Sequence, residues 1–219
     1  MKARLIGITK PIVDGMTEPS QMLAYCARVS STANQNNHTT GPKLLRFLVK
    51  RKEWSPLEMV NLVIEIETER DIARQMLRHQ FKFQEFSQRY ASMFQNFTRR
   101  RARMQDHKDR QNSIETDALH IQLGWSFGQW AVAFVCGAVY RIALRFGIAK
   151  EVARSVLPEG MTMSRMYVNG YLRNWIHFLE ARCDKKTQKE HREVAFAVRS
   201  ILVEQFPDIA DLIPGGEKV

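Results

Sequence analysis

The chain has 219 residues, and 33 lysines and arginines against 23 aspartates and glutamates give it a formal net charge of +10. This length can bury one substantial core, and a hydrophobic fraction of 44% excludes a disordered or low-complexity protein. Its three cysteines lie far apart, so a disulfide framework is not expected. The excess positive charge favours anionic partners: nucleic acid, a nucleotide or a phosphate ligand.

Neither a signal peptide nor a membrane span is expected. The first residues are basic but lack the long apolar segment and cleavage site of a signal peptide. The longest apolar run, Trp130–Tyr140, has about half of the ~20 residues that a bilayer requires. These features predict a cytoplasmic protein without a membrane partner.

The first part of the chain alternates between strand and helix patterns. The expected elements, in order, are a strand at Ala3–Thr9, helices at Pro19–Ser31 and Pro42–Lys50 on either side of a loop at Asn34–Thr40, a strand at Met59–Glu67 and a helix at Glu69–Arg78.

The rest of the chain is expected to be mostly helical. The expected elements are an extended segment at Phe81–Phe94, a polar loop at Asn96–Ser113, a long helix at Glu115–Phe146, a short helix at Ala149–Ser155, a turn at Leu157–Gly160, a strand at Thr162–Val168, and helices at Gly170–Arg182 and Thr187–Phe206. No repeat or linker divides the chain. The sequence therefore predicts one α+β domain over residues 1–219, with long helices packed on a mostly antiparallel central sheet.

The segment Gln75–Tyr90, QMLRHQFKFQEFSQRY, interleaves charged and polar groups with phenylalanines. If Phe81–Tyr90 is extended, period-2 alternation places Glu85, Ser87 and Arg89 in one row. Such a row suits a nucleotide, because the guanidinium can bind a phosphate bidentately while the smaller groups bind sugar or base. An exposed strand whose charges neutralise one another above packed aromatics explains the pattern equally well.

A second group of arginines comprises Arg154, Arg165, Arg173 and Arg182. Arg173 and Arg182 are nine residues apart, so on one helix they point to nearly opposite sides, whereas His177 shares the face of Arg173. Solvated helix charge is the commoner explanation for any single arginine. Several arginines that converge on one cleft would instead need an anion to offset them.

Other reactive patterns are absent from the sequence. It has no Ser–His–Asp order, no GxSxG turn, no metal-ligand histidine spacing, and neither a GxGxxG nor a GxxxxGK[ST] phosphate loop. We therefore expect no bound metal and no serine nucleophile.

The motifs, taken together, make the chain resemble the flavin-dependent thymidylate synthases, and in particular a viral or phage-like member. The signature of that family is Arg-His-Arg, seven residues and then Ser, with Glu two positions before the Ser and Arg-Tyr two after it. Arg78–His79 followed by FQEFSQRY is similar to it. Further similar motifs are ARVS at Ala27–Ser30, WSPLE at Trp54–Glu58, ARQMLRH at Ala73–His79, RMQDHKDRQNS at Arg103–Ser113, ARSVLPEG at Ala153–Gly160, LRNWIHFLEAR at Leu172–Arg182 and TQKEHREVA at Thr187–Ala195.

The resemblance implies an activity and an assembly. Members of the family are homotetramers that bind FAD where subunits meet. They methylate dUMP to dTMP, taking the carbon from methylenetetrahydrofolate and reducing equivalents from NADPH through the flavin. The likeness thus implies dUMP, folate and a second copy of the chain as partners, and makes nucleic acid an unlikely one.

The resemblance also implies site residues. The positions that match dUMP-binding residues are Gln75, Arg78, Glu85, Ser87, Arg89, Arg154 and Arg182. The positions that match FAD-binding residues are Ser55, Arg78, His79, Gln80, Glu85, Arg173 and His177. Arg182 matches a catalytic arginine that favours ionisation of the uracil ring, which is reasonable because a guanidinium stabilises negative charge on the ring.

The chain departs from the family pattern at two positions. Gln80 stands where the signature has its second arginine, and only six residues separate Gln80 from Ser87. Glu53 stands where the family often has a histidine. We predict that dUMP binding is retained and that FAD is bound less tightly.

Two alternatives remain open from the sequence. A nucleic-acid-binding protein would explain the charge, the Arg99–Arg103 run and the basic and aromatic residues of Phe81–Phe97, and its affinity would fall steeply with salt. An inactive relative would have a shortened signature loop that no longer holds flavin. The Arg99–Arg110 loop has no assigned role.

Overall fold

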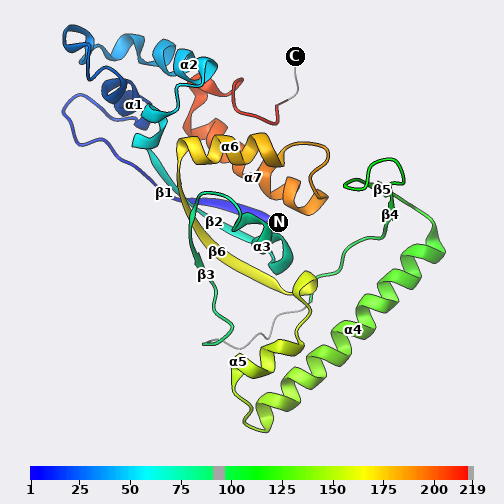
Figure 1. The fold of residues 1–219 in the computed structure, drawn as a ribbon. Helices are drawn as coiled ribbons and strands as arrows, with labels where there is room; N and C mark the ends of the chain where they lie inside the picture. The colour runs from blue at the N-terminus through cyan, green and yellow to red at the C-terminus, as the bar shows by residue number, and fades with distance from the viewer. Residues whose placement is uncertain (91–96, 217–219) are drawn as a thin grey trace. The chain divides into compact units, whose positions relative to one another are not determined.

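The computed structural model describes residues 1–90 and 97–216 (Figure 1). Contacts along the chain define two compact units. The first unit comprises 1–66, 79–84 and 167–219, and the second comprises 67–78 and 85–166. The expectation of one domain over residues 1–219 remains a prediction.

Four strands form the main sheet in the order β1-β2-β6-β3, with bounds β1 Lys2–Ile8, β2 Asn61–Glu69, β6 Met163–Tyr171 and β3 Lys82–Glu85. Backbone hydrogen bonds show that neighbours are antiparallel. Between β2 and β6, Leu172 N–H donates to the Val60 carbonyl, and Arg70 N–H donates to the Thr162 carbonyl, both over 2.9 Å. The predicted α+β class with an antiparallel sheet is therefore confirmed.

The first unit packs helices around β1 and the buried part of β2. Its helical elements are α1 Pro19–Ala27, η1 Thr32–Asn34, η2 His38–Thr40, α2 Gly41–Arg51, η3 Ser55–Met59, α6 Leu172–Arg182, α7 Lys189–Gln205 and η6 Pro207–Ile209. Leu62, Ile64 and Ile66 are fully buried at every second position of β2, as period-2 alternation requires. Trp175 and Phe178 of α6 are fully buried too, and α6 also packs against η3.

The second unit contains mostly helix and a short hairpin. Its elements are α3 Arg70–Met76, β4 Arg103–Gln105, β5 Ser113–Glu115, α4 Leu119–Arg145, α5 Lys150–Ala153, η4 Arg154–Val156 and η5 Glu159–Met161. Arg100 fixes the segment before the hairpin, because its guanidinium donates two 2.7 Å hydrogen bonds to Asp71. Its backbone carbonyl accepts hydrogen bonds from the side chains of Trp125 and Gln129 on α4.

Most element predictions are confirmed, with three corrections. The predicted loop Asn96–Ser113 contains β4, which pairs with β5 in antiparallel register, and α4 accordingly starts at Leu119 rather than Glu115. Gly170 lies within a strand rather than starting a helix, because β6 continues to Tyr171. The extended segment predicted at Phe81–Phe94 ends as a strand at Glu85, and its residues 91–94 lie outside the described part of the chain.

Helix α4 is unusually apolar for its exposure. It has 27 residues and is long and apolar enough to cross a bilayer by length and composition alone, although its longest apolar run, Trp130–Tyr140, is shorter. Only Gln129 and Tyr140 of this helix are buried. The rings of Phe127, Trp130 and Phe134 are 67%, 50% and 59% exposed and stack in series along one side. An exposed apolar surface of this kind is typical of a helix that is buried against another molecule.

Candidate functional site

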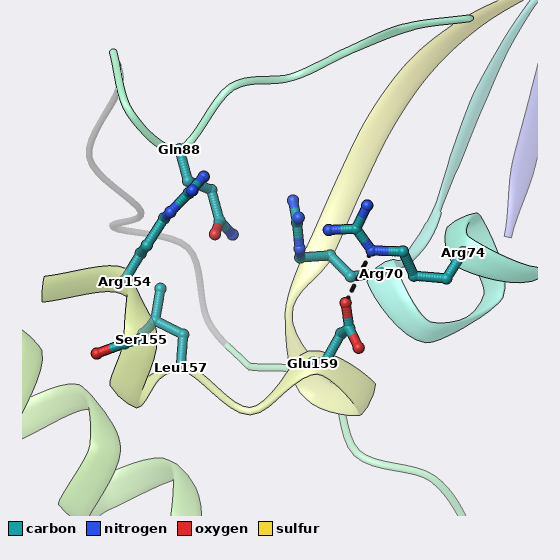
Figure 2. Close-up of a pocket in the computed structure, with 7 residues that line it drawn as sticks. All are labelled: Arg70, Arg74, Gln88, Arg154, Ser155, Leu157 and Glu159. Atoms are coloured by element: carbon teal, nitrogen blue, oxygen red, sulfur yellow. Dashed lines mark hydrogen bonds and ion pairs between the residues drawn. The ribbon is translucent and has the colours of Figure 1, made fainter. Parts of the chain in front are cut away.

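A cavity of about 290 Å³ lies in the second unit (Figure 2). Its lining residues are Arg70, Arg74, Gln88, Arg154, Ser155, Leu157 and Glu159. Three guanidinium groups thus face one carboxylate, and a cavity with this excess of positive charge suits an anionic ligand.

Three stretches of chain bring these side chains together, and Gln88 comes from the turn after β3. Arg70 and Arg74 come from α3, which packs against η5. Arg154 is the first residue of η4, the 3-10 helix that precedes η5 in the chain. Arg74 Nε lies 3.0 Å from Glu159 Oε1, so its charge is already paired. Across residues 1–90 and 97–216, Arg154 makes no ion pair or side-chain hydrogen bond. Arg154 is therefore the cavity arginine whose charge a ligand would have to balance.

Gln88 is a cavity residue that the sequence analysis did not single out. It is 4% exposed, and its Nε2 has no hydrogen-bond partner within the described part of the chain. Figure 2 shows its amide pointing into the space between Arg154 and Arg70. A buried amide without a partner costs about 1–3 kcal/mol, which a ligand oxygen in the cavity would recover.

The predicted row of Glu85, Ser87 and Arg89 on one strand face is wrong. The strand ends at Glu85, and a turn follows in which Tyr90 N–H donates to the Ser87 carbonyl over 3.2 Å. Alternation therefore fails after Glu85: Arg89 is exposed and pairs with Glu151 at 3.2 Å. The Ser87 hydroxyl accepts a 3.3 Å hydrogen bond from Arg89 N–H, which holds the turn locally.

The remaining second-unit predictions divide into two groups. Glu85 lies beside the cavity, because its carboxylate is 3.3 Å from the guanidinium of the lining residue Arg70. Gln75 is half-buried on α3 and Arg78 is exposed after it, and neither lines the cavity. Among the predicted dUMP residues, Arg154 thus lines the cavity, and Glu85 adjoins it through its ion pair with Arg70.

The first unit places three of the predicted flavin residues near η3. Ser55 begins η3, and the guanidinium of Arg173 forms an ion pair with Glu58 in the same turn. The ring of His177 packs edge-on against Trp54, with centroids 4.7 Å apart. Arg173 and His177 therefore share one face of α6, as their spacing predicts.

Arg182, at the other end of α6, faces the signature histidine instead. Arg182 Nε donates a 2.9 Å hydrogen bond to Nε2 of His79, whose ring packs edge-on against Phe178. Burial, together with the nearby charge of Arg182, lowers the pKa of His79 to about 4. His79 is therefore a neutral hydrogen-bond acceptor at pH 7.

The two departures from the family pattern lie at exposed positions. Gln80 follows His79 and is exposed. Glu53 is 50% exposed and lies 3.4 Å from Arg51, so its charge is paired within the same connection after α2. Neither side chain supplies a buried contact that would replace the arginine or histidine of the family.

Fold and geometry together define an α+β protein with arginines arranged for an anionic ligand. A family model described as "Thymidylate synthase complementing protein" matches residues 11–208. The chain is 45% identical over 214 residues to the flavin-dependent thymidylate synthase of Synechocystis sp., covering 96% of this chain and 98% of that protein. It is 43% identical over 211 residues to the probable flavin-dependent thymidylate synthase of Paramecium bursaria Chlorella virus 1, covering 96% and 97%.

A solved structure shares the fold. The UMP/dUMP methylase PolB from Streptomyces cacaoi, bound with 5-Br dUMP, superposes with a TM-score of 0.79 at 22% identity, covering 96% of this chain and 93% of that one. The chain belongs to the family of flavin-dependent thymidylate synthases. It is accordingly an FAD-dependent methyltransferase of dTMP biosynthesis, and the comparisons give no support to the polynucleotide-binding alternative.

Proposed function

We propose that this chain methylates dUMP to dTMP in the cytoplasm at the residues described above, with methylenetetrahydrofolate as carbon donor and NADPH as reductant of FAD. The observation that carries the assignment of the site is the cavity in which Arg154 has no acidic partner among the described residues. A phosphate monoester would balance that charge, and a guanidinium can bind it with two parallel hydrogen bonds.

The nucleotide is held, in this proposal, by residues of several elements: Gln75, Arg78, Glu85, Ser87, Arg89, Arg154 and Arg182. Arg154 supplies the charge for the phosphate, and the buried amide of Gln88 adds a donor to the same cavity. Arg89 would exchange its exposed pair with Glu151 for the ligand, which costs little because exposed ion pairs contribute about 0–1 kcal/mol.

The flavin residues proposed are Ser55, Arg78, His79, Gln80, Glu85, Arg173 and His177. Their chemistry fits FAD: hydroxyl, imidazole and guanidinium groups are donors for a pyrophosphate, and the Trp54–His177 pair offers an aromatic edge. Bound FAD supplies the reducing equivalents for the transferred carbon, so no protein nucleophile is needed. Because Gln80 replaces an arginine of the signature, we expect weaker FAD binding than in relatives with the full signature.

Arg182 is the proposed catalytic residue. The C5 carbon of uracil becomes nucleophilic when negative charge develops on the ring, and a fixed guanidinium beside the ring stabilises that charge. The 2.9 Å hydrogen bond to His79 fixes this guanidinium through Nε. A one-carbon unit from methylenetetrahydrofolate would replace the hydrogen at C5, which leaves as a proton, and reducing equivalents from bound FAD would bring that carbon to the methyl level.

A homotetramer is the proposed assembly, and α4 provides the apolar surface for it. Trp130 and Phe134 are 50% and 59% exposed and stack on each other, and α4 has few charges to keep them in water. A second copy of the chain would bury this face. We expect Phe134→Glu to reduce the assembly to smaller species in light scattering after size exclusion, whereas Ile12→Glu, at a 95% exposed loop position, leaves it intact.

The decisive experiment is tritium release from dUMP labelled at C5. Wild-type protein should release tritium only when FAD, NADPH and methylenetetrahydrofolate are all present, and a visible spectrum of the purified protein should show flavin. Arg154→Met should raise the KM for dUMP by about tenfold or more, because a charge-assisted contact to phosphate is lost. Protein that binds FAD but releases no tritium under any combination would disprove the proposed activity.

A further inference from the structure

Arg70 is more buried than Arg74, the other arginine that α3 contributes to the cavity. Its side chain is 12% exposed, compared with 50% for Arg74. It is the first residue of α3, where its backbone N–H donates to the Thr162 carbonyl over 2.9 Å and so anchors the helix to the start of β6. The backbone position of Arg70 is therefore fixed, and its long side chain has little freedom.

The partner of Arg70 is a carboxylate with a proposed role in ligand binding. Arg70 Nη1 lies 3.3 Å from Glu85 Oε1, and the hydroxyl of Ser164 donates a 2.7 Å hydrogen bond to the same oxygen. Ser164 is 4% exposed, and the Glu85 side chain is 22% exposed. One cation and one hydroxyl thus hold a single carboxylate oxygen, and among residues 1–90 and 97–216 the second oxygen is left for another partner.

The arginines of the cavity differ in whether an acidic side chain already pairs with them. Arg74 is paired with Glu159, and Arg70 with Glu85, whereas Arg154 has no acidic partner in the described part of the chain. Figure 2 shows Arg70 and Arg154 on different sides of the space into which Gln88 points. A ligand phosphate that binds Arg154 therefore need not displace the Arg70–Glu85 pair.

We propose that Arg70 is a positioning residue of the nucleotide site, which acts through Glu85 rather than on the ligand. This inference rests on the proposed function, in which Glu85 contacts dUMP. Arg70 and Ser164 hold the Glu85 carboxylate in one orientation, so that its second oxygen accepts a hydrogen bond from the nucleotide without first being ordered. Fixing a group before binding removes the entropic cost of ordering it during binding.

A double-mutant cycle tests whether Arg70 acts through Glu85. The full chain loaded with FAD is titrated with dUMP by calorimetry, for wild type, Arg70→Met, Glu85→Gln and the double variant. We expect each single variant to raise the Kd for dUMP by about tenfold, the size of one charge-assisted contact. In the Glu85→Gln background, Arg70→Met should have little further effect, because the carboxylate charge with which Arg70 pairs is already gone.

Additive effects in the cycle would overturn the proposal, since Arg70 would then act on the ligand directly or on the fold as a whole. An unchanged Kd for Arg70→Met would also overturn it. Arg70→Lys, which keeps a charge but not the planar fork, should recover part of the affinity. If Arg70→Met fails to fold, Arg70→Lys and Arg70→Gln take its place in the cycle.

The matched control is Arg4→Met. Arg4 of β1 also pairs with a glutamate, Glu65 of β2, at 3.0 Å, and it has no proposed ligand role. Its substitution should leave the Kd for dUMP unchanged. Wild-type protein that does not bind dUMP would refute the proposed function. If wild-type protein binds dUMP and the Arg70→Met variant binds it equally well, only the proposed role of Arg70 is refuted.

Discussion

Arg182 and His79 form a hydrogen bond in which the guanidinium Nε donates to the imidazole Nε2 over 2.9 Å. An imidazole nitrogen accepts a hydrogen bond only when it carries no proton, so this contact requires neutral His79 with its proton on Nδ1. A pKa of about 4 for His79 satisfies that requirement at pH 7. The histidine of the signature thereby fixes the arginine proposed for catalysis, in addition to any contact with flavin.

His79→Leu should therefore impair the chemical step. Leucine keeps the packing against Phe178 but removes the acceptor, so the Arg182 side chain gains rotamers. We expect tritium release from C5-labelled dUMP to fall by about tenfold in kcat at saturating FAD and dUMP, the size of one charge-assisted hydrogen bond. His79→Asn, whose side-chain oxygen can accept from Arg182, should retain more activity than His79→Leu. Equal activity of the two variants would contradict this role for His79.

The sequence was most informative where local pattern and burial agree. Period-2 alternation located β2, and helical periodicity located α6, so the shared face of Arg173 and His177 followed from spacing alone. The row of Glu85, Ser87 and Arg89 failed because alternation describes a strand only while the strand continues, and β3 ends at Glu85. Nothing in the local pattern marks that end, since the next residues are equally polar and aromatic.

The cavity was the least predictable part of the candidate site. Arg154 was found through a motif, but Arg70 and Gln88 were not singled out, because their roles depend on partners far along the chain. Gln88 is buried only because the turn after Glu85 directs it inward. The sequence spacing of two residues as far apart as Arg70 and Glu85 does not predict that they form an ion pair. The pair can be recognised only when both backbone positions are known.

His191 makes the stability of the protein depend on pH. The residue has no exposed surface, and burial first, then the charge of Arg182 and the proximity of His79, lowers its pKa to about 3. An unfolded chain has the ordinary pKa of about 6.5, so between pH 6.5 and 3 the unfolded state binds a proton that the folded state does not. The free energy of unfolding therefore decreases as pH falls through this window, by at most about 1.4 kcal/mol per pH unit from His191.

Urea unfolding at pH 7.5 and 5.5 measures this effect. Wild-type protein should lose more stability between the two values than His191→Gln, which cannot titrate, and the difference should be about 1 kcal/mol. Equal losses in the two proteins would show that His191 is protonated in the folded state or does not contribute.

Arg100 is predicted to be a structural arginine. Its guanidinium bonds both oxygens of Asp71 at 2.7 Å and lies 3.5 Å from the buried carboxylate of Glu69. Arg100→Met leaves these two carboxylates without that cation, and we expect the free energy of unfolding to fall by about 2–3 kcal/mol. Arg101→Met is the matched control: its pair with Asp117 is 69% and 96% exposed, so the change should stay below about 0.5 kcal/mol. Similar losses for the two variants would contradict the structural role of Arg100.

Gly170 leaves room for the ring of Phe81 to pack against α6. A methyl group added at Gly170 should disturb that packing. A Cβ at Gly170 would lie 2.4 Å from Cδ1 of Phe81, whose ring packs against Trp175 with centroids 4.3 Å apart. The ring cannot retreat without losing that contact, so Gly170→Ala should lower the free energy of unfolding by about 1–3 kcal/mol. Gly7→Ala on β1, where a Cβ meets nothing within 4 Å, should change it by less than 1 kcal/mol, about the usual propensity difference.

The same substitution should reach the proposed site, because Phe81 is two residues from His79 in the chain and its ring lies 6.2 Å from the imidazole. A displaced Phe81 would shift His79 relative to Arg182 and lengthen their hydrogen bond. We therefore expect Gly170→Ala to reduce tritium release even at a temperature where circular dichroism shows the variant fully folded. Loss of stability with unchanged kcat would mean that the ring of Phe81 moves independently of His79, and the predicted link between Gly170 and Arg182 would be wrong.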